Sequence, residues 1–222
     1  MTRVAIYAGA GIVVIWLLGV AHATDVVSLP IFDLDKEGTI PQAYSGLLLA
    51  VAATAAFVAA RCGAPRRGAL LILAAVFVYM SFDEVFRIHE ALDSELDFDW
   101  QVLYLPIVAL ALVGWLGVHR EIRGSSGARA LWIGGAACWV VAQALEVTQW
   151  HGHVRPGSIN GEGLSGAELE HELSRPSYLL KMLPEELLEM TGSLMFALVL
   201  AQLARRWVEN RTRRRAGYLP AS

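Results

Sequence analysis

The chain has 222 residues, of which 55% are hydrophobic and 18% are charged. A soluble domain carries about 25% charged residues, so this composition excludes an ordinary soluble protein and indicates a polytopic membrane protein. The cysteines Cys62 and Cys138 lack the spacing of a zinc or redox motif, and neither is placed for an extracytoplasmic disulfide.

Taken in chain order, six apolar runs are long enough to cross a bilayer core, which needs roughly 20 residues per helix. We therefore predict an all-α fold, a bundle of six transmembrane helices that forms a single domain over residues 1–222. The predicted helices cover residues 4–22, 41–60, 68–91, 100–118, 130–150 and 178–205. Residues 23–40, 92–99 and 151–177 are predicted as extracytoplasmic loops, and 206–222 as a basic cytoplasmic tail.

Three of these runs carry local signals of their own. The first ends at Ala21-His22-Ala23, which resembles a signal-peptidase site, but the run is longer than a usual signal sequence, so we expect an uncleaved helix. The second begins at Pro41, a favourable residue for the first turn of a helix. The fourth has no charge, and we expect Trp100 and Tyr104 to lie at the membrane interface as anchors.

Basic residues fall on one side of the predicted bundle. They are Arg3, Arg61, Arg66, Arg67, Arg120, Arg123, Arg129 and the six arginines between Arg205 and Arg215. The positive-inside rule then places both termini in the cytoplasm. We expect the arginine-rich tail to hold the chain to anionic lipid rather than to bind nucleic acid.

Carboxylates fall at similar depths on three of the predicted helices. Ionisable groups at membrane depth are costly, so they mark a functional site or a paired network. A rise of 1.5 Å per residue puts Asp83 and Glu84 ~22–24 Å from the cytoplasmic end of the third helix. The same count puts Glu146 of the fifth helix at ~24 Å, and Glu186 and Glu189 of the sixth at ~24–28 Å. These helices therefore bring acidic side chains into one layer in the outer third of the membrane.

Helical phase and nearby histidines extend this layer. Three histidines come out at or just above it, at ~27–32 Å by the same count, namely His22, His89 and His151. Glutamates share one face of the sixth helix, namely Glu185, Glu186 and Glu189. A polar stripe on the fifth helix consists of Gln143, Glu146 and Gln149. On the third helix one face holds Asp83, Arg87 and Glu90, whereas Glu84 is offset and His89 points elsewhere.

Carboxylates that approach one another inside a bundle cannot all stay ionised unless metal ions, bound protons or a cationic side chain compensates them. Bundles hold di-iron and di-manganese centres with carboxylates and imidazoles from several helices. The available donors suit iron, manganese or zinc, so we predict a site for one or two metal ions. Its predicted ligands are Glu84, Glu146, Glu186 and Glu189, with Asp83 and His89 as partners and Arg87 balancing the charge. Secondary candidates are His22, His151, Glu185 and Glu90.

Such a site would suit an oxidoreductase or a hydrolase that acts on a lipidic or membrane-proximal substrate. Other readings stay open. The soluble di-iron signature Glu-x-x-His is absent, and the nearest string is Glu186-x-x-Glu189. The acids could instead form a structural network, with a glutamate bonded to Gln143 or Gln149, in an accessory subunit of a larger complex or a homo-oligomer. They could also move protons in a small carrier, although the sequence has no clear inverted repeat. P-loop, Gly-x-Ser-x-Gly, His-Glu-x-x-His and Rossmann motifs are absent.

Three strings together resemble a group of uncharacterised bacterial multi-pass membrane proteins. They are Phe32-Asp33-Leu34-Asp35 with Glu37-Gly38 and Pro41, Ser81-Phe82-Asp83-Glu84 with His89-Glu90, and Glu185-Glu186-Leu187-Leu188-Glu189-Met190-Thr191-Gly192. The resemblance covers most of the helical region and implies a multi-pass protein of the bacterial inner membrane, without an established activity. It also implies that the first acidic loop belongs with the site at the outer face.

Overall fold

The structure is a computed structural model that describes residues 2–34, 38–86, 88, 100–149 and 176–216. Within these ranges the chain is all-helical. The elements in order are α1 (Thr2–Ala23), a short 3₁₀ helix η1 (Pro30–Phe32), α2 (Ile40–Arg61), α3 (Arg67–Phe86), α5 (Trp100–Glu121), α6 (Ser126–Gln149) and α8 (Pro176–Arg215). Six of these helices are long and apolar enough to cross a membrane, as in a multi-pass membrane protein.

The long helices begin and end within a few residues of their predicted positions, except at two places. The predicted end of the third helix, after Phe86, lies outside the described residues apart from Ile88. The sixth helix is longer than predicted, because α8 continues from Arg206 to Arg215 through the first part of the predicted basic tail. Arginine is a good helix former and is favourable in the last turn of a helix, where the carbonyl groups carry partial negative charge. An exposed pair between Arg205 and Glu209, four residues apart, also suits a helix.

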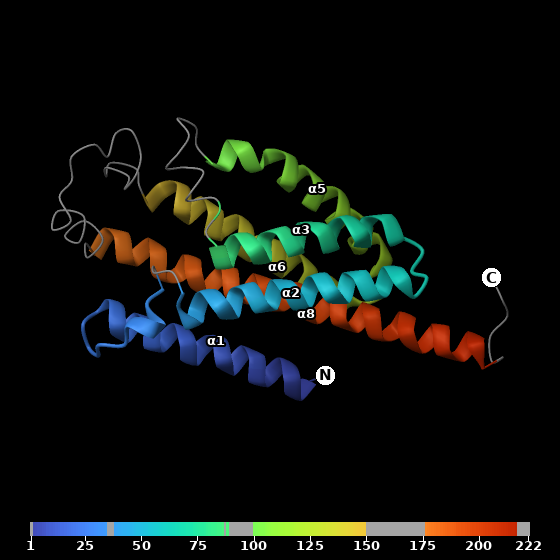
Figure 1. The fold of residues 1–222 in the computed structure, drawn as a ribbon, viewed down its shortest axis with the longest axis horizontal. Helices are drawn as coiled ribbons and strands as arrows, with labels where there is room; N and C mark the ends of the chain where they lie inside the picture. The colour runs from blue at the N-terminus through green and yellow to red at the C-terminus, as the bar shows by residue number, and fades with distance from the viewer. Residues whose placement is uncertain (1, 35–37, 87, 89–99, 150–175, 217–222) are drawn as a thin grey trace.

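Helices α2, α3 and α8 form the centre of the bundle. Helix α2 contacts both α3 and α8, while α6 packs on α8, α5 packs on α3, and α1 packs on α8 and α2 (Figure 1). The most apolar windows of α2 and α8 are 50% and 56% buried, against 17% for α1 and for α5. The outer helices therefore present apolar side chains outward, which is the arrangement that a lipid bilayer requires.

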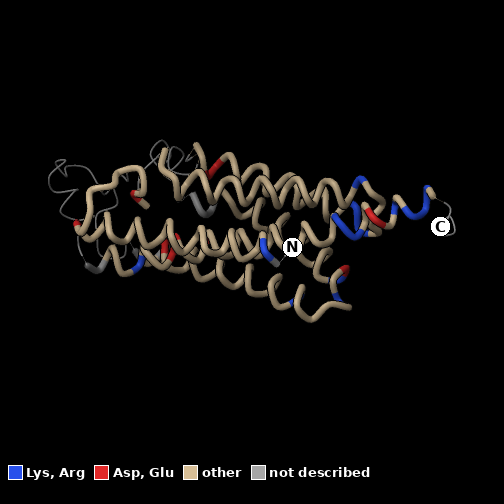
Figure 2. Tube along the Cα trace, turned by 90° about the horizontal axis from the view of Figure 1, so that it is seen from below, with Lys and Arg blue, Asp and Glu red and all other residues tan. Residues whose placement is uncertain are grey.

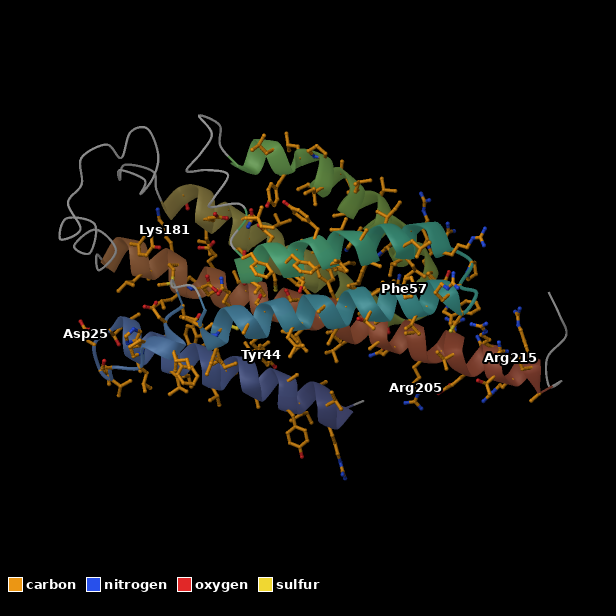
Figure 3. All side chains as sticks on the ribbon, viewed as in Figure 1. Asp25, Tyr44, Phe57, Lys181, Arg205 and Arg215 are labelled. Carbon is orange, nitrogen blue, oxygen red and sulfur yellow. The ribbon has the colours of Figure 1, made fainter. Side chains whose placement is uncertain are left out.

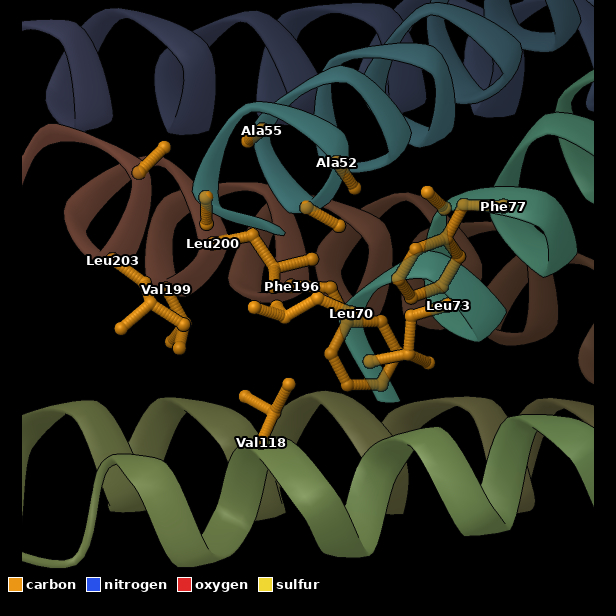
Figure 4. Close-up of a cluster of buried hydrophobic side chains, with 14 of the residues drawn as sticks. Ala52, Ala55, Leu70, Leu73, Phe77, Val118, Phe196, Val199, Leu200 and Leu203 are labelled. Atoms are coloured by element: carbon orange, nitrogen blue, oxygen red, sulfur yellow. The ribbon is translucent and has the colours of Figure 1, made fainter. Parts of the chain in front are cut away.

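Small residues let the central helices approach closely. Ala52, Ala56 and Ala59 lie along one face of α2 and are fully buried. Leucine and phenylalanine side chains from α3 and α8 fill the space beside them, among them Phe77 and Phe196, whose ring centroids are 5.6 Å apart (Figure 4). In lipid, helices associate through such close packing rather than through the hydrophobic effect. The core therefore fixes where α3 and α8 lie relative to α2.

Charged side chains gather at the two ends of the bundle. Arginines mark the end where α8 terminates, which we call the basic end, while acids lie mainly toward the other end (Figure 2). In Figure 3, Arg205 and Arg215 mark the basic end, and Asp25 and Lys181 mark the opposite one, the acidic end. The positive-inside rule predicts that the basic end faces the cytoplasm.

Candidate functional site

Glutamates from three helices lie near Glu189 of α8. Four other carboxylates lie within electrostatic range of it, namely those of Glu84 on α3, Glu146 on α6, and Glu185 and Glu186 on α8. We call these five residues the carboxylate cluster. Glu185 is buried, and the other four are partly buried. The structure thus brings together the four predicted ligands and one of the secondary candidates.

Gln143 links the two helices that carry most of the cluster. Its carboxamide Nε2 donates to Glu146 Oε2 on the same helix at 3.2 Å and to Glu189 Oε1 on α8 at 3.4 Å. One amide NH₂ group has two hydrogens, so it can serve both acceptors. The expected hydrogen bond between Gln143 and a glutamate is therefore present, and it ties α6 to α8 within the cluster.

Two facing glycines explain how α6 and α8 come so close. A Cβ atom at Gly192, one turn after Glu189, would lie 2.9 Å from the carbonyl oxygen of Gly135 and 2.6 Å from Cδ1 of Trp139. A Cβ atom at Gly135 would lie 3.2 Å from the carbonyl oxygen of Gly192. Small residues allow backbones in membranes to approach in this way. The close contact positions the polar stripe of α6 beside the glutamates of α8.

Helix α3 reaches the cluster through a similar contact with α2. Ser81 Oγ donates to the Gly46 carbonyl at 2.8 Å. A Cβ atom at Gly46 would lie 2.8 Å from Cγ2 of Val85 and 3.8 Å from Cγ of Glu84. Only glycine leaves room for α3 here without a shift of its side chains. Glu84 is therefore positioned by backbone packing on the α2 side.

Asp83 faces α5, although it was predicted as a partner of Glu84 in the metal site. Tyr104 donates its hydroxyl hydrogen to Asp83 Oδ1 at 2.8 Å, and Tyr79 donates to the Tyr104 hydroxyl oxygen at 2.6 Å. Successive helical residues differ by about 100° in direction, so adjacent acids serve different faces of α3. Tyr104, which was expected to be an interfacial anchor, is 9% exposed and lies between helices. The spacing of four between Tyr79 and Asp83 was the available signal for this chain of hydroxyl groups.

His22 is engaged by the loop that follows α1. Its Nδ1 accepts a hydrogen bond from the Leu29 N–H at 3.3 Å, and its Nε2 lies 3.4 Å from Asp33 Oδ2. Both ring nitrogens are therefore occupied, and this secondary metal candidate holds the loop in place. The loop in turn packs on α8 through Leu34, which clusters with Tyr178 and Met182. The first acidic loop thus lies against the same stretch of α8 that leads to the cluster.

Lys181 is a cationic side chain of α8 at the acidic end of the bundle, and the sequence alone did not single it out. It lies one helical turn before Glu185 on α8. Its ammonium group donates to the carbonyl oxygen of Thr148, in the last turn of α6. Such terminal carbonyls lack donors within the helix and carry partial negative charge. Lys181 therefore joins the ends of α6 and α8.

Four predicted site residues lie outside the part of the chain whose side chains the structure describes: Arg87, His89, Glu90 and His151. Among the described residues, no group of three His, Cys, Asp or Glu side chains is arranged to hold a metal ion. The cluster is nevertheless a concentration of acids on helices that are long and apolar enough to cross a membrane. Such groups need protons, a cation or basic side chains to compensate their charge.

The fold and the cluster define a multi-pass helical membrane protein with acidic side chains gathered toward one end of its bundle. More particularly, the chain belongs to the family described as Domain of unknown function (DUF8692), whose sequence model matches residues 5–203. The match includes every residue of the carboxylate cluster. No curated protein and no solved structure matches the chain. The similarity to bacterial multi-pass proteins carried by the three sequence strings stays a prediction.

Proposed function

We propose that this protein binds one or two metal ions in the carboxylate cluster, near the extracytoplasmic face of a bacterial inner membrane. The observation that supports this proposal is the position of four glutamates from three helices around Glu189. A cation at the centre of such a group would neutralise charges that otherwise repel one another in a medium of low dielectric constant. Oxygen donors of this kind suit manganese or iron, and zinc accepts carboxylates as well.

Metal binding requires the glutamate side chains to turn toward a common point. Glu84, Glu146, Glu186 and Glu189 would be the ligands, and each has rotatable bonds that allow this movement. The backbones are already fixed by the Gly135–Gly192 and Gly46–Ser81 contacts. The proposed site is therefore a rigid frame that carries adjustable ligands.

Proton exchange by the same glutamates is the second candidate, and the Gln143 hydrogen bonds favour it. An amide that bridges Glu146 and Glu189 joins acids from two helices into one network. Protons bound within that network would compensate the charge without a metal ion. A proton-coupled carrier would use these acids to take up and release protons during transport.

Elemental analysis of protein purified without a His tag in mild detergent tests the first candidate. We expect near-stoichiometric iron, manganese or zinc in the wild type, and loss of that metal in Glu186→Ala and Glu189→Gln. Glu209→Gln is the matched control, because Glu209 is an exposed acid of the same helix at the basic end. The control should keep its metal.

Absence of metal from the wild type would favour the second candidate, which liposome assays then address. In that case a proton gradient should drive transport across the liposome membrane. The substitution Glu146→Gln should abolish that transport. A protein without metal and without flux that retains other subunits in mild detergent would instead be an accessory subunit. The three outcomes use the same purified chain and are mutually distinguishable.

A further inference from the structure

The end of α2 carries a tight helix cap at the basic end. The Gly63 N–H donates to the Ala60 carbonyl at 3.4 Å, and the Ala64 N–H donates to the Ala59 carbonyl at 3.3 Å. This pair of bonds defines a Schellman motif. Gly63 has a φ angle of +93°, which glycine adopts without steric strain. The cap therefore ends α2 sharply at Arg61, whose side chain is exposed.

Arg211 joins the extended part of α8 to this cap. Its Nη1 donates to the Arg61 carbonyl oxygen at 3.1 Å. The last carbonyls of a helix carry partial negative charge, so a guanidinium group is favourable there. A guanidinium has five N–H donors, and this bond uses one of them. Arg211 thus fixes α8 against α2 and keeps donors for another acceptor.

A pocket of about 260 Å³ lies beside this contact. It is lined by residues 61–63 and by Trp207, Asn210, Arg211 and Arg214. Three of the lining residues are arginines, and none is acidic. The exposed acid of this part of α8, Glu209, is paired with Arg205 and does not line the pocket. The pocket is therefore a concentrated positive site.

The pocket lies at the level of the lipid headgroups. Helix α2 has 22 residues, so it spans ~33 Å and crosses the ~30 Å hydrocarbon core. Arg61 ends that helix, which places the pocket at the boundary between hydrocarbon and water. Trp207 packs against the hydrophobic core from the pocket side, and tryptophan is typical of this boundary.

We propose that this pocket binds the phosphate headgroup of an anionic phospholipid. The planar guanidinium groups of Arg61, Arg211 and Arg214 match the geometry of phosphate oxygens, with Asn210 as a further donor. Basic pockets between helices at the cytoplasmic side of a membrane bind headgroups of this kind. The volume exceeds the ~30 Å³ of a single water molecule severalfold and admits a phosphate with its glycerol ester. The site lies at the opposite end of the bundle from the carboxylate cluster and is independent of it.

Native mass spectrometry of the full chain in nonionic detergent tests this proposal. The protein is titrated with phosphatidylglycerol, with phosphatidylcholine as the neutral comparison and inorganic phosphate as the lipid-free one. We expect one phosphatidylglycerol to bind per chain in preference to phosphatidylcholine. The double variant Arg61→Gln/Arg214→Gln should weaken that binding at least about tenfold, because it removes two of the three charged donors.

Arg66→Gln/Arg213→Gln is the matched control, since it removes one arginine from the α2–α3 turn and one from α8 outside the pocket. We expect it to bind phosphatidylglycerol within about twofold of the wild type. An equal loss of phosphatidylglycerol binding in the two double variants would overturn the proposal, because it would show that the lipid is attracted to the net charge alone. Binding of inorganic phosphate as tight as that of the lipid would also overturn it. Thermal unfolding in the same detergent shows whether each variant is folded. Asn210→Leu is a second variant of the pocket, and it keeps all of the charges.

Discussion

Gln143 on α6 donates a hydrogen bond to Glu189 on α8, with 3.4 Å between Nε2 and Oε1. The same amide donates to Glu146 at 3.2 Å. A neutral donor thus lies between two acids that belong to different helices. In the proposed site this amide orients both ligands, and in a proton network it joins them. In either role, Gln143 connects the cluster glutamates of α6 with those of α8.

Replacement of Gln143 by leucine should destabilise the protein by about 1–3 kcal/mol, because two partly buried carboxylates lose a donor. The free energy of unfolding in mild detergent measures this effect. Gln202→Leu is the control, since Gln202 is an exposed residue of α8 outside the cluster. Its stability should change by less than about 0.5 kcal/mol. Equal effects of the two substitutions would show that the bridge makes no special contribution.

A methyl group at Gly192 should separate α6 from α8. The added Cβ would lie 2.9 Å from the carbonyl oxygen of Gly135, and a backbone atom cannot turn away as a side chain can. We expect Gly192→Ala to lower the unfolding free energy by about 1–3 kcal/mol, as overpacked cores do. It should also weaken metal binding, because Glu146 and Glu189 move apart.

Gly9→Ala tests whether that effect is specific to the contact. A Cβ atom at Gly9 of α1 would meet nothing within 4 Å. Alanine is the better helix former by about 1 kcal/mol, so this variant should be as stable as the wild type or more so. A Gly192→Ala protein that matches Gly9→Ala in stability would contradict the close α6–α8 packing.

The Tyr79–Tyr104–Asp83 chain should stabilise the contact between α3 and α5. Tyr104→Phe removes the hydroxyl that donates to Asp83 and accepts from Tyr79. The loss of these two hydrogen bonds should cost about 1–3 kcal/mol of stability, which thermal or denaturant unfolding can measure. Tyr7→Phe is the matched control, because Tyr7 is 73% exposed. A Tyr104→Phe protein of unchanged stability would mean that Tyr79 and Asp83 find other hydrogen-bond partners.

The sequence allowed the helices and the depth of the carboxylates to be predicted, for a simple physical reason. A membrane helix must satisfy its backbone internally, so long apolar runs are helices, and a constant rise converts residue number into depth. Glu84, Glu146 and Glu189 fell into one layer by this count, and the structure brings them together.

The direction in which a side chain points around its helix axis was harder to predict than the position of the residue along that axis. Asp83 and Glu84 lie at nearly the same depth, yet Asp83 bonds to Tyr104 of α5 while Glu84 lies near Glu189. That difference depends on which helices are neighbours, and hydropathy does not contain this information. The basic pocket depends on the same missing knowledge, because Arg61 and Arg211 meet only when α8 packs along α2. The helical extension to Arg215 was missed because a run of arginines reads as a charged tail.

Binding of manganese to metal-free protein, followed by electron paramagnetic resonance, tests the central proposal most directly. Free Mn²⁺ gives a strong signal that is lost when the ion is bound, so a titration counts the sites. We predict one or two saturable sites per chain in the wild type and in Glu209→Gln, and none of comparable affinity in Glu189→Gln. A wild type that leaves the manganese signal unchanged and holds no iron or zinc, or a Glu189→Gln protein that binds as tightly, would contradict a metal site in the carboxylate cluster.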